Sequence, residues 1–161
     1  VIISLPKWAK GGHMKRTRNF STGFSLVELL VVVAIIGILS AIAVPNYTSY
    51  VQRGKIQEAT SFLADSRTKL EQFFMDNRTY AGGAGAWACG GAAPAGSRYF
   101  DFTCRGTATT YVVSAVGKAA EGMTGFTYTV NEANTRTSTF TGLSGWNNSA
   151  NCWVIKKGES C

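Results

Sequence analysis

Residues 23–44 read GFSLVELLVVVAIIGILSAIAV and end against Pro45. Between Phe24 and Val44 only three side chains are polar: Ser25, Glu28 and Ser40. A helix of about 20 apolar residues is long enough to cross roughly 30 Å of hydrocarbon, so this stretch predicts a transmembrane helix that anchors the rest of the chain. An acidic residue in such a run costs about 2.5 to 3.5 kcal/mol at mid-bilayer and less near the interface. The presence of Glu28 therefore indicates that its charge has a use.

Basic residues precede this apolar run. Five of the 16 Lys and Arg residues lie before Phe24 with no acidic residue among them, so the remaining eleven stand against all 9 acidic residues. Basic residues directly before a spanning segment hold that flank in the cytoplasm. The net charge of +7 thus indicates membrane topology more than a nucleic-acid partner. At 161 residues the chain has room for one membrane segment and one domain on the far side of the membrane.

The start of the chain allows more than one interpretation. Residues 1–13 show no sustained period, whereas Met14 begins a compact basic leader ending at Gly23, so we expect Met14 to be the true start. An ordinary secretory signal is one alternative, with an A-x-A-like sequence at residues 41–43; its apolar core, however, is normally 7 to 15 residues long. An uncleaved signal anchor is another, but it explains neither Gly23 nor Glu28.

The segment from residue 15 to about residue 80 resembles the type IV pilins of Gram-negative bacteria. The residues that carry the resemblance are Gly23, Phe24, Glu28, Gly37, Pro45 and Tyr47. The resemblance implies that a prepilin peptidase cuts after Gly23 on the cytoplasmic side and that the new amine of Phe24 is methylated. It also implies a pilin fold, and it names as partners the peptidase and methyltransferase, the inner membrane, the pilus assembly machinery and other pilin subunits.

Glu28 is the expected assembly residue. If the mature chain begins at Phe24, its amine is a positive charge four residues before Glu28, a spacing that places both on one helical face. In a stack of such helices, the acid of one subunit can meet the amine of its neighbour, and each neutralises a charge that is costly alone. We therefore expect Glu28 to set the register between subunits.

The helix is expected to continue beyond the membrane, with residues 24–45 as the transmembrane and polymerisation segment and residues 46–77 as an amphipathic spine. Apolar residues spaced by three, four or seven define one face: Ile56, Ala59, Leu63, Leu70 and Phe73 or Phe74. Gly37 and Pro45 predict a kink, because proline removes a backbone hydrogen bond and clashes with the preceding turn.

Residues 78–161 predict a globular head, giving an α+β fold in which the long helix packs on a small antiparallel sheet. We expect residues 78–108 to be a loop region, with glycine and alanine keeping residues 81–98 on the surface. Residues 109–141 predict an antiparallel meander of three strands. Residues 142–161 form the last region, bounded by a disulfide in the pilins that it resembles.

Four cysteines, Cys89, Cys104, Cys152 and Cys161, allow three pairings, which sequence alone does not distinguish. Sequential pairing is preferred because each bond then closes a short loop. Disulfides agree with an oxidising compartment. A zinc site is the alternative, but the chain has no CxxC spacing.

No catalytic, metal or cofactor site is expected. His13 is the only histidine and lies before the proposed cleavage point, which removes histidine-dependent nucleophilic sites and histidine metal ligands from the mature chain. Aromatic and basic residues of the head could form a weak DNA patch, although the simpler interpretation places the aromatics in the core: Trp87, Tyr99, Trp146, Trp153, Arg98, Arg105, Lys156 and Lys157.

The sequence therefore predicts a non-enzymatic structural subunit. The leading hypothesis is a minor pilin for pilus biogenesis, adhesion and twitching motility, held first as a single-pass inner-membrane precursor with its head in the periplasm and then displayed on the extracellular fibre. The alternatives are a major pilin, a type II secretion pseudopilin and a signal-anchored periplasmic binding module.

Overall fold

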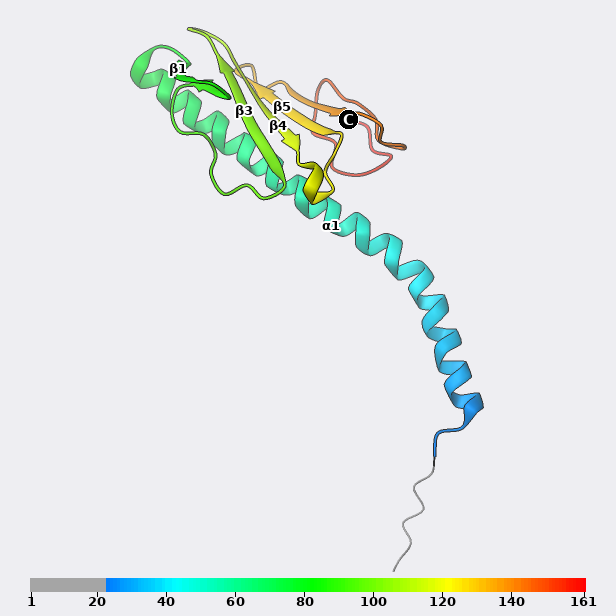
Figure 1. The fold of residues 1–161 in the computed structure, drawn as a ribbon. Coiled ribbons are helices and arrows are strands. Elements are labelled where there is room, and N and C mark those ends of the chain that lie inside the picture. Colours follow the sequence, from blue (N-terminus) through cyan, green and yellow to red (C-terminus); the bar gives the residue numbers. More distant parts are fainter. Residues whose placement is uncertain (1–22) are drawn as a thin grey trace, which may run out of the picture. The chain divides into compact units, whose positions relative to one another are not determined.

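A computed structural model describes residues 23–161. The chain divides into two units, residues 1–40 and residues 41–161, and each is described by itself. One helix, α1 (Leu26–Asn77), contributes to both (Figure 1). The predicted long N-terminal helix is confirmed, and it begins two residues after Phe24. The helix continues through Gly37 and Pro45, and the predicted kink stays a prediction.

The head contains one six-stranded sheet in the order β1-β2-β3-β4-β5-β6. The strands are β1 (Ala81–Ala84), β2 (Trp87–Cys89), β3 (Phe100–Gly106), β4 (Tyr111–Gly117), β5 (Phe126–Asn131) and β6 (Arg136–Phe140). The strands from β3 to β6 form an antiparallel meander. A short 3-10 helix, η1 (Ala119–Glu121), lies between β4 and β5. The meander of β4, β5 and β6 agrees with the sequence prediction.

The predicted loop over residues 78–108 is wrong in part, because it contains three strands. In β3, Phe100 and Cys104 are buried and Asp101 and Arg105 are exposed, an arrangement typical of a strand with one buried face. β1 and β2 form an antiparallel pair, and β2 runs parallel to β3, so the sheet is mixed.

Glycine in this region allows close packing between segments. Composition alone predicted a loop because glycine is also typical of loops. A Cβ on Gly90, directly after β2, would lie 2.0 Å from the ring of Phe73. The Gly90 N–H donates to the Tyr80 carbonyl at 2.8 Å. Strands without β-branched side chains therefore form here because their backbone pairs with neighbours and an aromatic ring packs on a bare Cα.

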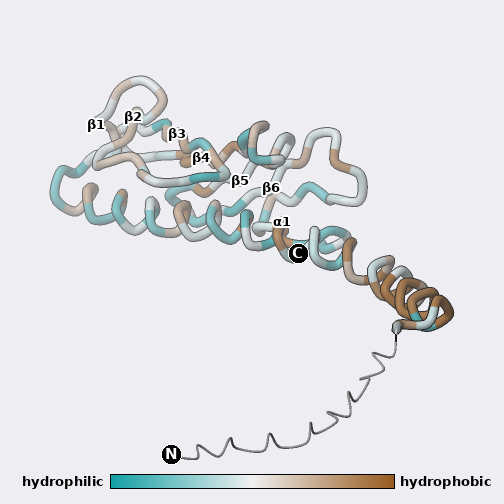
Figure 2. Tube along the Cα trace, turned by 60° about the horizontal axis from the view of Figure 1, so that its bottom comes forward, coloured by the Kyte–Doolittle hydropathy of each residue, from teal (hydrophilic) through white to brown (hydrophobic). Residues whose placement is uncertain are grey.

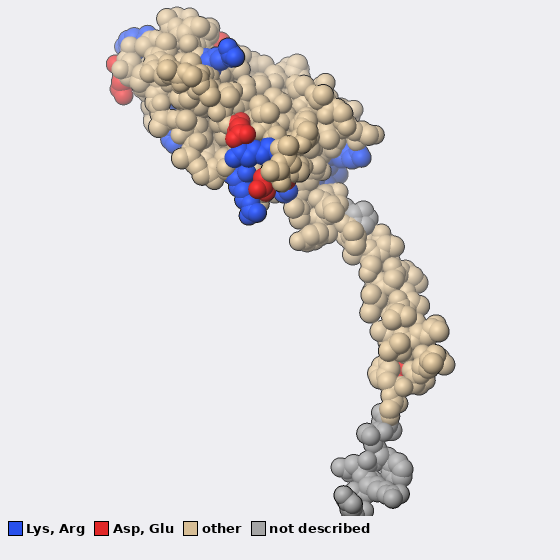
Figure 3. Space-filling model, viewed as in Figure 1, with Lys and Arg blue, Asp and Glu red and all other residues tan. Residues whose placement is uncertain are grey.

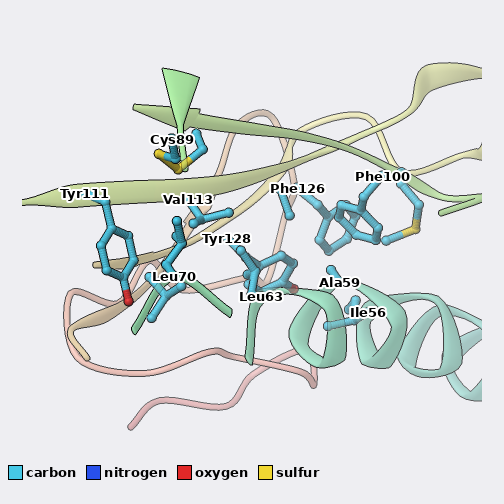
Figure 4. Packing of buried hydrophobic residues seen from close by; sticks show 14 of the residues in the cluster. Ile56, Ala59, Leu63, Leu70, Cys89, Phe100, Tyr111, Val113, Phe126 and Tyr128 are labelled. Atoms are coloured by element: carbon cyan, nitrogen blue, oxygen red, sulfur yellow. A yellow bond between two sulfur atoms is a disulfide. The ribbon is translucent and has the colours of Figure 1, made fainter. Parts of the chain in front are cut away.

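The core lies between α1 and the sheet. Ile56, Ala59, Leu63 and Leu70 of the predicted stripe are at most 1% exposed. Figure 4 shows these helix residues facing side chains of the sheet, including Phe100, Tyr111, Val113, Phe126 and Tyr128. The stripe that periodicity predicted is thus the face that joins the helix to the head.

The C-terminal region covers the end of the sheet and is held by two kinds of bond. Cys89 bonds to Cys104, and Cys152 bonds to Cys161, which is the sequential pairing. The Tyr128 hydroxyl donates to the Val154 carbonyl at 2.9 Å within the core. The Cys89–Cys104 bond joins β2 to β3, whereas the Cys152–Cys161 bond and the Tyr128 hydrogen bond fix the C-terminal segment, which has no regular secondary structure.

Candidate assembly segment and head surface

The proposed cleavage point lies in an exposed, non-helical segment before α1. Gly23, Phe24 and Ser25 precede the helix, and the Leu29 N–H donates to the Ser25 carbonyl at 3.1 Å. Phe24 is 68% exposed, and a Cβ on Gly23 would meet nothing within 4 Å. A processing enzyme could therefore reach the Gly23–Phe24 bond without displacing packed side chains.

Glu28 lies in the first turn of α1 and is exposed. Phe24 stands two residues before the helix, and its nitrogen belongs to a peptide bond in this chain. The predicted pairing of Glu28 with a neighbour's Phe24 amine concerns chains that begin at Phe24, and it stays a prediction. An acid at a helix N-terminus is stabilised by the helix dipole, so the first turn of α1 suits Glu28.

The apolar segment from Phe24 to Val44 exposes nearly all of its side chains. Its large hydrophobic residues are between 43% and 79% exposed. The brown segment in Figure 2 is this part of the chain, and α1 is the helix long and apolar enough to cross a membrane among residues 23–161. A continuous apolar surface of this size marks a membrane or partner contact.

The head has a charged surface that contrasts with this segment. Figure 3 shows acidic and basic side chains lying beside one another on the head and almost none on the apolar segment. One group of charges joins α1 to the chain before β3. The Glu58 Oε1 atom accepts hydrogen bonds from the Ser97 hydroxyl at 2.6 Å, the Arg98 N–H at 2.9 Å and the Tyr99 N–H at 3.0 Å. We call Glu58 and these three donors the Glu58 clamp.

Residues around η1 extend the same contact. Lys55 of α1 donates to the Glu121 carbonyl at 2.6 Å and lies 5.1 Å from the centre of the Tyr99 ring. Lys118 donates to the Ser97 carbonyl at 3.1 Å and lies 3.4 Å from Asp101. The loop before β3 is thus held from α1 and from η1 together.

A second polar group lies near the far end of α1. Glu71 accepts hydrogen bonds from the hydroxyls of Tyr80 at 3.0 Å and Tyr111 at 3.4 Å. Burial, followed by the negative charge of Glu71, raises the pKa of Tyr111 above its usual range. Burial also raises the pKa of Tyr80, with the Glu71 hydrogen bond as the next cause. Both hydroxyls therefore remain protonated donors at neutral pH.

The structure separates most of the aromatic and basic residues that could have formed one DNA patch. Trp87, Tyr99, Trp146 and Trp153 are partly buried and pack against the core, as the simpler interpretation expected. Arg98 lies 3.6 Å from Glu121. Arg98 also lies over the Tyr99 ring, 5.4 Å from its centre. Trp146, Lys156 and Lys157 come together in a groove that they share with Arg53 of α1. Periodicity did not reveal this groove, because its two sides are about 100 residues apart in sequence.

Within residues 23–161 no group of three or more His, Cys, Asp or Glu side chains is placed to hold a metal ion. The four cysteines, which were the candidates for zinc, are all in disulfides. The cysteines of the head therefore serve as covalent links within the fold.

Two family models match the chain. Residues 18–44 match the prokaryotic N-terminal methylation motif, which spans Gly23, Phe24 and Glu28. Residues 45–127 match the model described as "Type IV minor pilin ComP, DNA uptake sequence receptor", which is just over half of the chain. The methylation motif and the head are thus recognised independently.

Curated pilins resemble mainly the N-terminal part. The type IV major fimbrial protein FimA of Dichelobacter nodosus is 41% identical over 61 residues, which are 38% of this chain and 39% of that protein. Fimbrial protein EcpC of Eikenella corrodens is 34% identical over 100 residues, 62% of this chain and 59% of that protein. The chain thus spans about two fifths of the length of the first of these relatives.

Two solved structures are also similar. The non-core minor pilin PilV of Neisseria meningitidis aligns with a TM-score of 0.49 at 15% identity, covering 60% of this chain and 94% of PilV. A type IV pilin of Shewanella oneidensis aligns with a TM-score of 0.43 at 21% identity, covering 64% of this chain and 98% of that one. With the methylation motif, the apolar helix and a minor pilin model over half of its length, this chain belongs to the type IV pilin family.

Proposed function

We propose that this pilin is a minor subunit of a type IV pilus, with roles in pilus biogenesis, adhesion and twitching motility. The observation that supports a minor role is the match of residues 45–127 to a minor pilin model, since this part of the chain forms the spine and most of the head. The head is a hydrogen-bonded scaffold, and we infer a structural rather than a catalytic role.

The proposed life of the subunit follows from its N-terminal segment. The precursor sits in the inner membrane with its head in the periplasm, a prepilin peptidase cuts after Gly23, and a methyltransferase modifies Phe24. The assembly machinery then packs the apolar helix against those of other pilins, and the exposed surface of residues 24–44 supplies the apolar contact. In that packing Glu28 pairs with the Phe24 amine of a neighbour.

Fibre composition distinguishes this proposal from its alternatives. Cells are sheared, and the fibres are analysed by quantitative mass spectrometry against the total pilin content. A minor pilin is found in the fibres as a small fraction of the subunits. A dominant fraction would make it a major pilin. Absence from the fibres with retention at the membrane would favour a pseudopilin or an anchored binding module.

Glu28 can be tested separately from the rest of the fold. A Glu28→Ala variant should be processed, inserted in the membrane and folded, yet absent from sheared fibres, because the Phe24 amine of its neighbour loses its counter-charge. Glu28→Gln is the matched control for size, and it should fail in the same way. Normal incorporation of both variants would refute the pairing.

DNA binding is a second candidate function, and the match to a model of a DNA uptake sequence receptor favours it. Binding of the full-length protein to a labelled DNA duplex, measured by anisotropy over a range of salt, tests it. Each phosphate contact should contribute a slope of about −0.9 in log K against log salt, and substitution of the exposed Arg105 by Gln should lower that slope if it is one contact. No binding at low salt would exclude this function.

A further inference from the structure

A basic groove lies at the base of the head, and we call it the Arg53 groove. It has a volume of about 160 Å³ and is lined on one side by Arg53 of α1 and on the other by Trp146, Lys156 and Lys157. None of its lining residues is acidic. Within residues 23–161 no ion pair involves its three cations. The groove therefore presents three positive charges that no ion pair in the described part of the chain neutralises.

The carboxylate nearest in sequence to Lys156 and Lys157 is that of Glu159, and it already accepts backbone hydrogen bonds. Glu159 accepts hydrogen bonds from the backbone N–H groups of Ile155 at 3.3 Å and Lys156 at 3.2 Å. It closes the turn that carries the lysines, and the Cys152–Cys161 disulfide closes the same segment. The groove is thus built on a braced turn.

The wall of the groove is fixed by close packing. A Cβ on Gly145 would lie 2.3 Å from Cε of Lys157, so the lysine stem passes over the bare Cα of this glycine, whose φ of 78° also favours glycine. The Trp146 ring lies 4.9 Å from the rings of Phe126 and Phe140, which ties it to the core. The tryptophan is therefore held in place in the groove that it lines together with Arg53 and Lys157.

The groove also lies at a defined height along α1. The apolar run ends at Val44, and Arg53 is nine residues further on, roughly 13 Å at 1.5 Å per residue. Headgroup layers extend about 5 to 8 Å beyond the hydrocarbon on each side of a bilayer. Side chains of a helix tilt toward its N-terminus, and long basic side chains reach back to the interface. Arg53 therefore lies within reach of phospholipid headgroups when the apolar run is in a membrane.

We propose that the Arg53 groove binds the phosphate of an anionic phospholipid headgroup while the precursor waits in the membrane. Charge complementarity and the distance from Val44 select this occupant, and tryptophan is enriched at the same interface in membrane proteins. The inference rests on the proposed membrane-anchored precursor. Such a contact would hold the head close to the bilayer until the subunit is extracted.

Native mass spectrometry of the full-length precursor tests this proposal. The protein is released from membranes in mild detergent, mixed with equal amounts of phosphatidylglycerol and phosphatidylcholine, and the retained lipids are counted. The wild type should retain phosphatidylglycerol in preference. Near a charged surface each cation contributes roughly fivefold in affinity, so Lys156→Gln/Lys157→Gln should lower that preference about 25-fold, and Arg53→Gln about fivefold.

The control is Arg78→Gln/Arg105→Gln, which removes two exposed cations outside the groove and should keep the preference. Equal losses in both double variants, or equal retention of the two lipids by the wild type, would overturn the proposal. Displacement of the lipid by inorganic phosphate or by a DNA duplex at equal concentration would also overturn it, by assigning the groove to that ligand. A precursor that is not recovered with membranes would instead refute the proposed function, so the two failures differ.

Discussion

Substitution of Glu58 tests how strongly the Glu58 clamp stabilises the packing of α1 against the head. Glu58→Ala removes the oxygen that accepts hydrogen bonds from Ser97, Arg98 and Tyr99. Hydrogen bonds to a charged group contribute about 1.5 to 3 kcal/mol each when solvent cannot replace them. Arg98 is exposed and Tyr99 only half-buried, so water recovers part of the loss. We therefore expect a total loss of about 2 to 3 kcal/mol in the free energy of unfolding.

For a folded unit of this size, 1 kcal/mol corresponds to roughly 3 to 5 °C in Tm. Glu58→Ala should therefore lower the Tm of the full-length protein in detergent by about 6 to 15 °C. Hydrogen exchange gives a local readout, since the amides of Arg98 and Tyr99 should exchange faster in the variant, while the amides of β4 and β5 keep their order of protection.

Two controls separate the clamp from a general effect of substitution. Glu58→Gln keeps a carbonyl oxygen but loses the charge, and it should cost about 1 kcal/mol. Gln57→Ala alters the exposed neighbour and should stay within about 0.5 kcal/mol of the wild type. If Glu58→Ala melts within 1 °C of Gln57→Ala and the two amides are equally protected, the clamp does not stabilise the head.

Three further predictions concern the head. Gly90→Ala should lower the free energy of unfolding by about 1 to 3 kcal/mol in urea titrations, because its Cβ would overlap the Phe73 ring; a variant as stable as the wild type would show that the ring is not packed there. Burial raises the pKa of Tyr111 and of Tyr128 above the ordinary value of 10.0, so the unfolded chain loses these protons at a lower pH than the folded chain. The free energy of unfolding should therefore be constant below pH 10 and fall above pH 10, by up to about 1.4 kcal/mol per pH unit per tyrosine. Thermal melts from pH 8 to 11 check this prediction, and a Tm that does not change over this range would contradict it. Replacing both Cys89 and Cys104 with Ala opens a loop of 15 residues and should lower the free energy of unfolding by about 3 kcal/mol. The same change at Cys152 and Cys161, which are 9 residues apart, should lower it by about 2.6 kcal/mol. Denaturant titrations measure both losses, and the reverse order would refute this ranking.

The elements that were predicted well from the sequence are those in which apolar residues recur at a regular spacing. Spacing by three, four and seven identified the α1 stripe, and Ile56 and Leu63 of that stripe are fully buried. β-branched and aromatic alternation identified β4 and β5 in the same way. In these elements the residues that the local pattern places on one face are the residues that make the tertiary contacts, so the pattern identifies both the element and its buried face.

The elements that sequence missed depend on contacts between distant segments. β1 and β2 contain mostly glycine and alanine, and they form because Phe73 and the Cys89–Cys104 bond hold them against the sheet. The Arg53 groove likewise joins α1 to the C-terminal segment. The Glu58 clamp had no sequence signal, since a single Glu on an amphipathic helix does not reveal which loop it will bind.

The central claim is that a Phe24 amine and Glu28, one helical turn apart, align neighbouring subunits in a fibre. The most direct measurement is the mass of the N-terminal peptide of this protein recovered from sheared fibres. Our account predicts a peptide that begins at a methylated Phe24. A peptide that begins at Val44, or that still carries the basic leader before Gly23, would contradict it.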